Sequence, residues 1–162
     1  MTFATVAAYN AKMNNQNYHS EESIGFMTIT AHRMLQSTFR RKLKESDIDL
    51  TPDQWGVLVM LWGKDSATQD ELAAGQCVDK STISRTLSAM RDKGLITKEI
   101  DPTNERKKII STTEASLELR ERVFAMASES MRLALSGVPE EDAATCMRVL
   151  AAIKRNLAEK HG

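Results

Sequence analysis

Three successive cations, Arg106, Lys107 and Lys108, end the octapeptide DPTNERKK at residues 101–108. The apolar, β-rich segments GLITKEI and IISTT flank it, so the pattern predicts the polar tip of a β-hairpin. A solvated turn needs polar side chains but does not need three cations in a row, whereas phosphate groups attract them. The pattern therefore indicates a tip that contacts phosphates, with an ordinary solvated turn as the alternative.

A second polar stretch, KSTISR, opens a predicted helix before the hairpin. Small hydroxyl side chains allow a helix to lie close to a duplex and to hydrogen-bond its phosphates or bases, and a helix N-terminus itself attracts phosphate. An arginine can reach the O6/N7 edge of guanine or a phosphate. The expected DNA contacts of this helix are Lys80, Ser81, Thr82, Ser84 and Arg85. The alternative is that its serines and threonines only cap and solvate a surface helix.

Positive charge is concentrated around these two stretches. Basic and acidic residues are equal in number, 22 of each, so the net charge of the chain is zero. Residues 79–108 nevertheless carry eight basic and five acidic side chains. The middle of the chain is therefore locally positive, which the net charge hides.

Helices are predicted before these stretches. The first starts at the N-cap Ser20, with two acidic residues in its first turn, and its apolar residues recur at a helical period: Ile24, Met27, Ala31, Leu35, Phe39 and Leu43. The second is capped by Thr51, has Pro52 at its first position and ends at Gly63. Its sequence, DQWGVLVMLWG, is apolar enough to be buried on most sides.

Two shorter helices and the hairpin follow. The third helix begins with the capping box Thr68-x-x-Glu71 and is expected to end at Gly75. The fourth is capped by Asp79, ends at Gly94 and has an apolar face made by Ile83, Leu87 and Met90. The segments LITKEI and KKIISTT are the predicted strands, and two further helices complete the chain.

These elements predict a mainly α fold with a small β wing. A winged helix–turn–helix occupies residues 51–113, long helices flank it at residues 20–50 and 114–162, and residues 1–19 form a loosely ordered extension. The long helices carry apolar stripes that the small lobe cannot cover, so a second copy of the chain is expected to bury them. A two-fold dimer would read a pseudo-palindrome with half-sites about 10 base pairs apart.

The motif assigns places on DNA to the two polar stretches. The second helix of a helix–turn–helix enters the major groove, and a hairpin beside it lies over the neighbouring minor groove. A narrow A·T-rich minor groove attracts an inserted arginine, a role that suits Arg106, with Asp101 placed to pair with it. Lys107 and Lys108 would contact phosphates or only solvate the strand. Contacts to the DNA backbone are also expected from Thr68 and Gln69.

The region from Ser20 to Lys160 resembles the MarR family of bacterial transcriptional regulators. DLTPDQWGVLVML resembles the family's second-helix segment, DKSTISRTLSAMRDKGLI its recognition helix and strand, and DPTNERKK its Asp-Pro-x-Asp-x-Arg wing. Asn104 replaces the usual wing aspartate, and Glu105 reduces the wing charge. The usual Leu-Thr after the hairpin is Thr112-Thr113, and Ser116 replaces a common glycine. The resemblance implies an obligate homodimer whose terminal helices interlock.

The same resemblance implies repression that a small molecule or oxidation relieves. Family ligands lie between the dimerisation helices and the winged lobe, where a small aromatic or anionic effector would meet His32, Phe39, Trp55, Val59 and Trp62. Alternatively, both tryptophans are core residues and the histidine is an ordinary, partly exposed one. Cys77 precedes the recognition helix by two residues, so its oxidation is expected to perturb DNA binding directly. A small residue packed in the turn is the simpler interpretation, and Cys146 is expected in the core or an interface.

Other classes of protein lack support in the sequence. No apolar run is long enough to span a bilayer and the N-terminus resembles no secretory signal, so a cytoplasmic location is expected. The cysteines fit no metal-ligand spacing, and no nucleophile–base set or phosphate loop is present, so neither an enzyme nor a cofactor is expected. The sequence thus predicts a dimeric, DNA-binding repressor released by a small molecule. The alternatives are a winged helix used for protein contact, or a redox-responsive regulator acting through Cys77.

Overall fold

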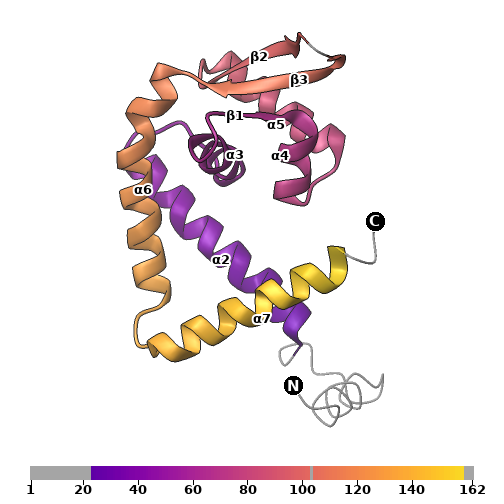
Figure 1. Ribbon diagram of the computed structural model, residues 1–162. Helices are drawn as coiled ribbons and strands as arrows, with labels where there is room; N and C mark the ends of the chain where they lie inside the picture. Colours follow the sequence, from indigo (N-terminus) through magenta and orange to yellow (C-terminus); the bar gives the residue numbers. More distant parts are fainter. Residues whose placement is uncertain (1–22, 103, 159–162) are drawn as a thin grey trace.

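The computed structural model describes residues 23–102 and 104–158, without the side chains of Glu105 and Arg106. Figure 1 shows a compact lobe of short helices and a small sheet, with three long helices below and beside it. The long helices are α2 (Ile24–Glu45), α6 (Glu114–Ala134) and α7 (Glu140–Ala158). The lobe contains α3 (Pro52–Trp62), β1 (Ser66–Thr68), α4 (Gln69–Gln76), α5 (Lys80–Asp92), β2 (Ile96–Asp101) and β3 (Asn104–Thr112). The predicted mainly α fold with a β wing is confirmed.

The first long helix begins later than the sequence pattern predicts. Ser23 is the N-cap of α2, and its hydroxyl accepts a hydrogen bond from the amide of Phe26. The predicted cap Ser20 and the predicted extension at residues 1–19 lie outside the described residues. The expected acidic first turn is therefore absent from α2 as described. Ser23 can take the role because it also precedes the apolar period directly.

The local signals for the helices of the lobe are confirmed, with one exception. Thr51 caps α3 in a capping box and Pro52 occupies its first position. Thr68 and Glu71 form the predicted capping box of α4. The exception is Gly75, which lies inside α4 because its missing side chain makes room for Met60 of α3. Cys77 ends α4 instead, in a left-handed conformation with φ of 53°.

The wing contains a strand that the sequence pattern did not predict. The sheet is antiparallel in the order β1-β3-β2, and β1 pairs Ala67 with Ile110. A three-residue strand is too short to show an alternating pattern. It has a partner because the edge of β3 opposite β2 is available to pair with it. β2 and β3 form the expected hairpin, with an irregular register between Ile100 and Asp101 near its tip. The third strand attaches the base of the wing to the start of α4.

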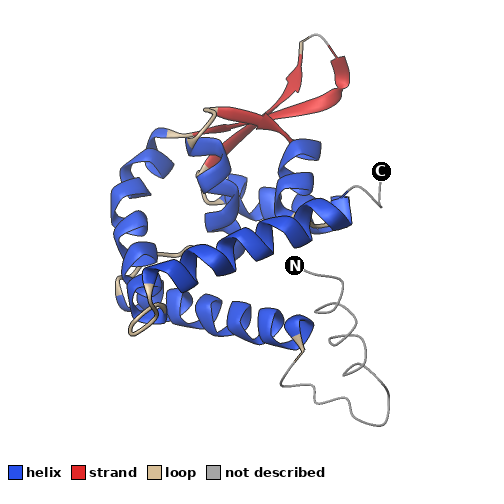
Figure 2. Cartoon of the chain, turned by 60° about the horizontal axis from the view of Figure 1, so that its bottom comes forward, coloured by secondary structure: helices blue, strands red, loops and turns tan. Residues whose placement is uncertain are grey.

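The core lies almost entirely in the lobe and at its junction with α2 and α6. The apolar face predicted for α5 is buried, as are Leu58 and Leu61 of α3 and Ile110 of β3. By contrast, no described side chain of α7 is buried. Figure 1 shows α7 below the lobe and connected to it through α6, and Figure 2 shows the same helices from another side. Large exposed apolar side chains on the long helices include Phe26, Met27, Met34, Leu133, Met147 and Leu157.

Candidate nucleic-acid interface

The start of α5 is fixed by its N-cap, Asp79. One carboxylate oxygen accepts hydrogen bonds from the amides of Ser81 and Thr82, each at 2.8 Å, and from the hydroxyl of Ser81 at 2.6 Å. The other oxygen accepts from the hydroxyl of Thr82 at 2.8 Å. The hydrogen bond from Ser81 and those from Thr82 hold the pKa of Asp79 far below its ordinary value. The two hydroxyls expected to donate to DNA therefore donate to the cap, and only their lone pairs remain available.

The remaining predicted residues of α5 differ in their exposure. Lys80 and Arg85 are exposed, whereas Ser84 is half-buried. Their helix packs its opposite, apolar face against the lobe. The first two turns of α5 thus present two cations outward, and Arg85, which is in no ion pair with Asp70, can reach a base edge or a phosphate.

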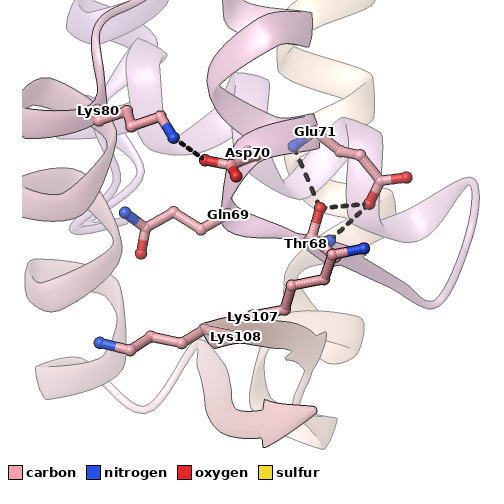
Figure 3. A pocket seen from close by; sticks show the side chains of 7 residues that line it. All are labelled: Thr68, Gln69, Asp70, Glu71, Lys80, Lys107 and Lys108. Atoms are coloured by element: carbon pink, nitrogen blue, oxygen red, sulfur yellow. Dashed lines mark hydrogen bonds and ion pairs between the residues drawn. The ribbon is translucent and has the colours of Figure 1, made fainter. Parts of the chain in front are cut away.

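Lys80 is held by an acidic residue of the preceding helix. Its ammonium lies 3.0 Å from a carboxylate oxygen of Asp70, and both side chains are largely exposed. Figure 3 shows this ion pair at the edge of a hollow of about 540 Å³. The hollow is lined by Thr68, Gln69, Asp70, Glu71, Lys80, Lys107 and Lys108. The structure therefore brings the starts of α4 and α5 and the cations of the wing to one concave surface, and it places carboxylates among them.

Thr68 is engaged in capping rather than free for a ligand. Its hydroxyl donates to Glu71 at 2.7 Å and accepts from the Glu71 amide at 3.3 Å. The Glu71 carboxylate also accepts from the Thr68 amide at 2.7 Å. The backbone and side-chain hydrogen bonds from Thr68 lower the pKa of Glu71. A phosphate at this helix start would have to approach an ionised carboxylate, so Gln69 is the better placed of the two predicted backbone contacts.

Sequence reasoning missed Lys98, which belongs to this surface. It lies on β2, and its ammonium donates to the side-chain oxygen of Gln69 at 3.0 Å. Burial, and then the nearby charges of Lys108 and Arg91, lower the pKa of Lys98. Three cations gathered in this way favour an anion. The strand alternation Ile96, Lys98, Ile100 placed a lysine on the inward face and was the available signal.

The tip of the wing is described only in part. Lys107 and Lys108 are exposed and line the hollow. Asp101 is half-buried at the end of β2. The side chain of Arg106 lies outside the described parts of the chain, so its predicted pairing with Asp101 and its insertion into a minor groove stay predictions.

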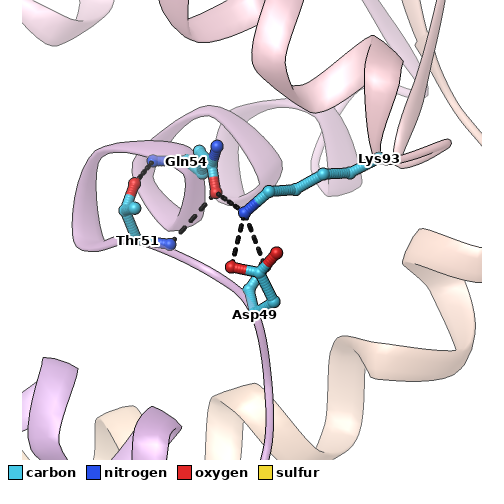
Figure 4. A network of polar contacts seen from close by, with 4 residues as sticks. All are labelled: Asp49, Thr51, Gln54 and Lys93. Atoms are coloured by element: carbon cyan, nitrogen blue, oxygen red, sulfur yellow. Dashed lines mark hydrogen bonds and ion pairs between the residues drawn. The ribbon is translucent and has the colours of Figure 1, made fainter.

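The far end of α5 is attached to the segment between α2 and α3. Lys93 is the C-cap of α5, and its ammonium donates to the backbone oxygen of Asp49 at 3.0 Å and to its carboxylate at 2.7 Å. Gln54 accepts from the same ammonium at 3.4 Å and from the amide of Thr51 at 3.1 Å. Figure 4 shows these four residues around the first turn of α3. Polar contacts therefore hold both ends of α5.

A smaller cavity of about 230 Å³ lies between α2, α3 and α6. It is lined by His32, Leu35, Gln36, Phe39, Pro52, Trp55, Ala127, Ser130 and Met131. Three of the five predicted effector contacts are among these residues, and Val59 and Trp62 are not. Trp62 is buried, and its ring lies 5.6 Å from that of Trp55 and 5.6 Å from that of Phe124. Trp62 therefore supports the wall of aromatic rings behind the cavity.

The structure also bears on membrane-spanning helices, metal ligands and the two cysteines. No helix of the described residues is long and apolar enough to cross a membrane. Among those residues, no group of histidine, cysteine and carboxylate side chains could hold a metal ion. Cys77 is exposed, so the simpler interpretation of a packed residue in the turn is wrong. Cys146 is exposed too, which excludes the core of this chain and leaves the interface open.

The sequence of the lobe is similar to that of a known family. Residues 50–108 match the model of the MarR family. The chain is therefore similar to the MarR family over its lobe. Its residues share the fold and 27% identity with a solved probable transcriptional regulator from Pseudomonas aeruginosa, at a TM-score of 0.74 over 83% of this chain and 99% of that one.

Two further proteins similar to this chain have names that describe regulation. The HTH-type transcriptional repressor NicR of Pseudomonas putida is 24% identical over 128 residues, which are 79% of this chain and 80% of NicR. The structure of Bordetella bronchiseptica BpsR, solved to explain regulation of its DNA binding by 6-hydroxynicotinic acid, has a TM-score of 0.76. It is 19% identical and covers 85% of this chain and 96% of its own. The BpsR comparison establishes the fold, and the chain is a transcriptional regulator whose residues 50–108 are similar to the MarR family.

Proposed function

We propose that this chain is a MarR-type regulator that binds a pseudo-palindromic DNA site as a homodimer and represses transcription until a small molecule releases it. One observation carries the DNA contacts: Lys80 of α5 and Lys107 and Lys108 of the wing line a single concave surface. Arg85 is exposed on the same helix as Lys80. A recognition helix placed in the major groove would bring the wing to the neighbouring phosphates. Arg85 is assigned to a base edge, and Lys98, Lys107 and Lys108 are assigned to the DNA backbone.

The long helices support the homodimer. α7 is a helix of 19 residues with no buried side chain, and its apolar residues Met147 and Leu157 are 68% and 56% exposed. The N-terminal half of α2 exposes Ile24, Met27 and Ile29 as well. Apolar surface of this extent on three helices marks a protein interface, because monomers rarely expose it. A second copy of the chain would cover it and place two lobes on one face.

The cavity beside Trp55 supports release by a small molecule. Its volume is about 230 Å³, and its walls combine aromatic rings with three polar side chains, His32, Gln36 and Ser130. Pockets of this composition hold small aromatic ligands in a fixed orientation. BpsR, whose DNA binding is regulated by 6-hydroxynicotinic acid, has the same fold. NicR is a repressor, so repression is the proposed mode here. A cytoplasmic location accompanies this proposal.

In vitro selection of duplex DNA by the purified protein, at two salt concentrations, tests the proposal. Recovery of a pseudo-palindrome with strongly salt-dependent binding is expected, because phosphate contacts release counterions. Arg85→Ala should reduce preference for the selected sequence by about 1–3 kcal/mol per half-site, and Arg106→Ala should weaken binding at A·T-rich minor-groove positions. Absence of any enriched sequence, from protein freed of bound ligand by unfolding and refolding, would favour a winged helix used for protein contact.

A further inference from the structure

The first turn of α3 lies between the cavity and the end of the recognition helix. Pro52 lines the cavity. The carboxylate of Asp53 accepts a hydrogen bond at 3.3 Å from Gln36, which lines the cavity from α2. Gln54, the next residue, is buried and accepts from Lys93 at the end of α5. Three consecutive residues thus connect the cavity with the end of α5: Pro52 and Asp53 contact the cavity side, and Gln54 contacts Lys93.

Lys93 makes a polar contact between the end of the recognition helix α5 and this turn. Its ammonium contacts the backbone and carboxylate oxygens of Asp49 and the amide oxygen of Gln54. That amide oxygen also accepts from the Thr51 amide in the capping box of α3. A movement of the first turn of α3 would therefore change the acceptors of Lys93 and the cap of α3 together.

We propose that Lys93 is a positioning residue that couples the cavity beside Trp55 to the recognition helix through the first turn of α3. The inference rests on the proposed function and adds the route by which an occupied cavity changes DNA binding. Coupling between two sites is reciprocal, so DNA binding must also change the cavity. That reciprocity allows a test without a known effector.

The ion pair between Lys93 and Asp49 contributes little to the stability of the fold. Lys93 is 28% exposed and the Asp49 side chain 87% exposed, so water screens the ion pair, and its loss should leave the core intact. Asp49, 44 positions away in sequence, nevertheless supplies a backbone oxygen and a carboxylate oxygen to the Lys93 ammonium. An exposed link of this kind can break and re-form without unfolding the lobe.

Affinity for the selected duplex is the first readout. Lys93→Met and Asp49→Ala change the net charge in opposite directions, so simple electrostatic attraction to DNA predicts opposite effects. A positioning role predicts that both lower affinity by about threefold, the loss of one partly exposed pair, and that Lys93→Arg restores most of it. Opposite effects, or no effect from either change, would overturn the proposal while leaving DNA binding itself established.

Trp55 fluorescence is the second readout, since its ring lines the cavity. The chain has two tryptophans, so Trp62→Phe leaves Trp55 as the only emitter. With excitation at the red edge of tryptophan absorption, saturating selected duplex should shift its emission. The shift should disappear in the Lys93→Met background at saturating DNA and return with Lys93→Arg. A shift that persists in Lys93→Met would overturn the coupling, whereas a parent protein that binds no duplex would overturn the proposed function and this inference together.

Discussion

The winged lobe and the long helices use their apolar residues in opposite ways. In the lobe, Leu58, Leu87 and Ile110 are completely buried against other residues of the same chain. On the long helices, Met34, Leu133 and Met147 are more than half exposed. The lobe therefore has a core of its own, whereas the long helices expose apolar surface that the proposed partner copy would cover. The proposed function assigns DNA binding to the first region and assembly to the second.

The largest effect is expected from charge placed on α7, which should disrupt the proposed dimer. Met147→Lys together with Leu157→Lys should convert the protein to a monomer, because the new ammonium groups would be buried at the proposed interface. Binding to a two-half-site duplex should then be lost, while circular dichroism retains the helical signal. Light scattering gives the mass. A double variant that stays dimeric would place the interface elsewhere.

Truncation of a leucine in each region sharpens the contrast. Leu87→Ala removes a fully buried side chain of α5 and should lower the free energy of unfolding by about 2–5 kcal/mol at any protein concentration. Leu157→Ala is the matched control on α7. Its effect should appear only at concentrations where the dimer forms. Chemical denaturation at several concentrations measures both. Equal, concentration-independent losses would contradict the division into two regions.

Asp70 provides a smaller test within the lobe. Its carboxylate neutralises Lys80 at 3.0 Å on the surface proposed for DNA. Asp70→Asn should raise affinity for duplex DNA by about twofold to fivefold, and the freed cation should increase the salt dependence by about one phosphate contact. Asp142→Asn on α7 removes the same charge far from the lobe and should have no such effect. Unchanged binding in Asp70→Asn would exclude Lys80 from the contact.

The smallest expected effect is on the stability of the lobe at acid pH. The capping carboxylates Asp79 and Glu71 have pKa values lowered by hydrogen bonds in the folded lobe, so they stabilise it above their ordinary values of 3.8 and 4.5. Stability should hold between neutral pH and about pH 5, then fall as the pH drops through the folded-state pKa values. Asp79→Asn should flatten this acid dependence in melting experiments. An unchanged acid profile would show that the cap contributes little.

Much of the lobe could be predicted because its signals are local. The caps Thr51 and Thr68 act on amides three residues away, so their effect depends only on neighbouring residues. The buried face of α5 follows from helical periodicity alone. The same reasoning failed for the end of α4, where Gly75 lies within the helix against the end of the Met60 side chain and forms no turn. Local patterns do not distinguish these two uses of glycine.

The sequence by itself determined the winged helix–turn–helix, the caps of its helices and the concentration of cations at residues 79–108, because each depends on neighbouring residues or composition. Only the tertiary structure decided which of those cations are available to contact DNA. It placed Asp70 on Lys80, directed the hydroxyls of Ser81 and Thr82 into the cap, and joined Lys98 to Gln69 across 29 positions. Hydrogen bonds reach only about 3 Å, so chain folding alone brings distant partners within that range.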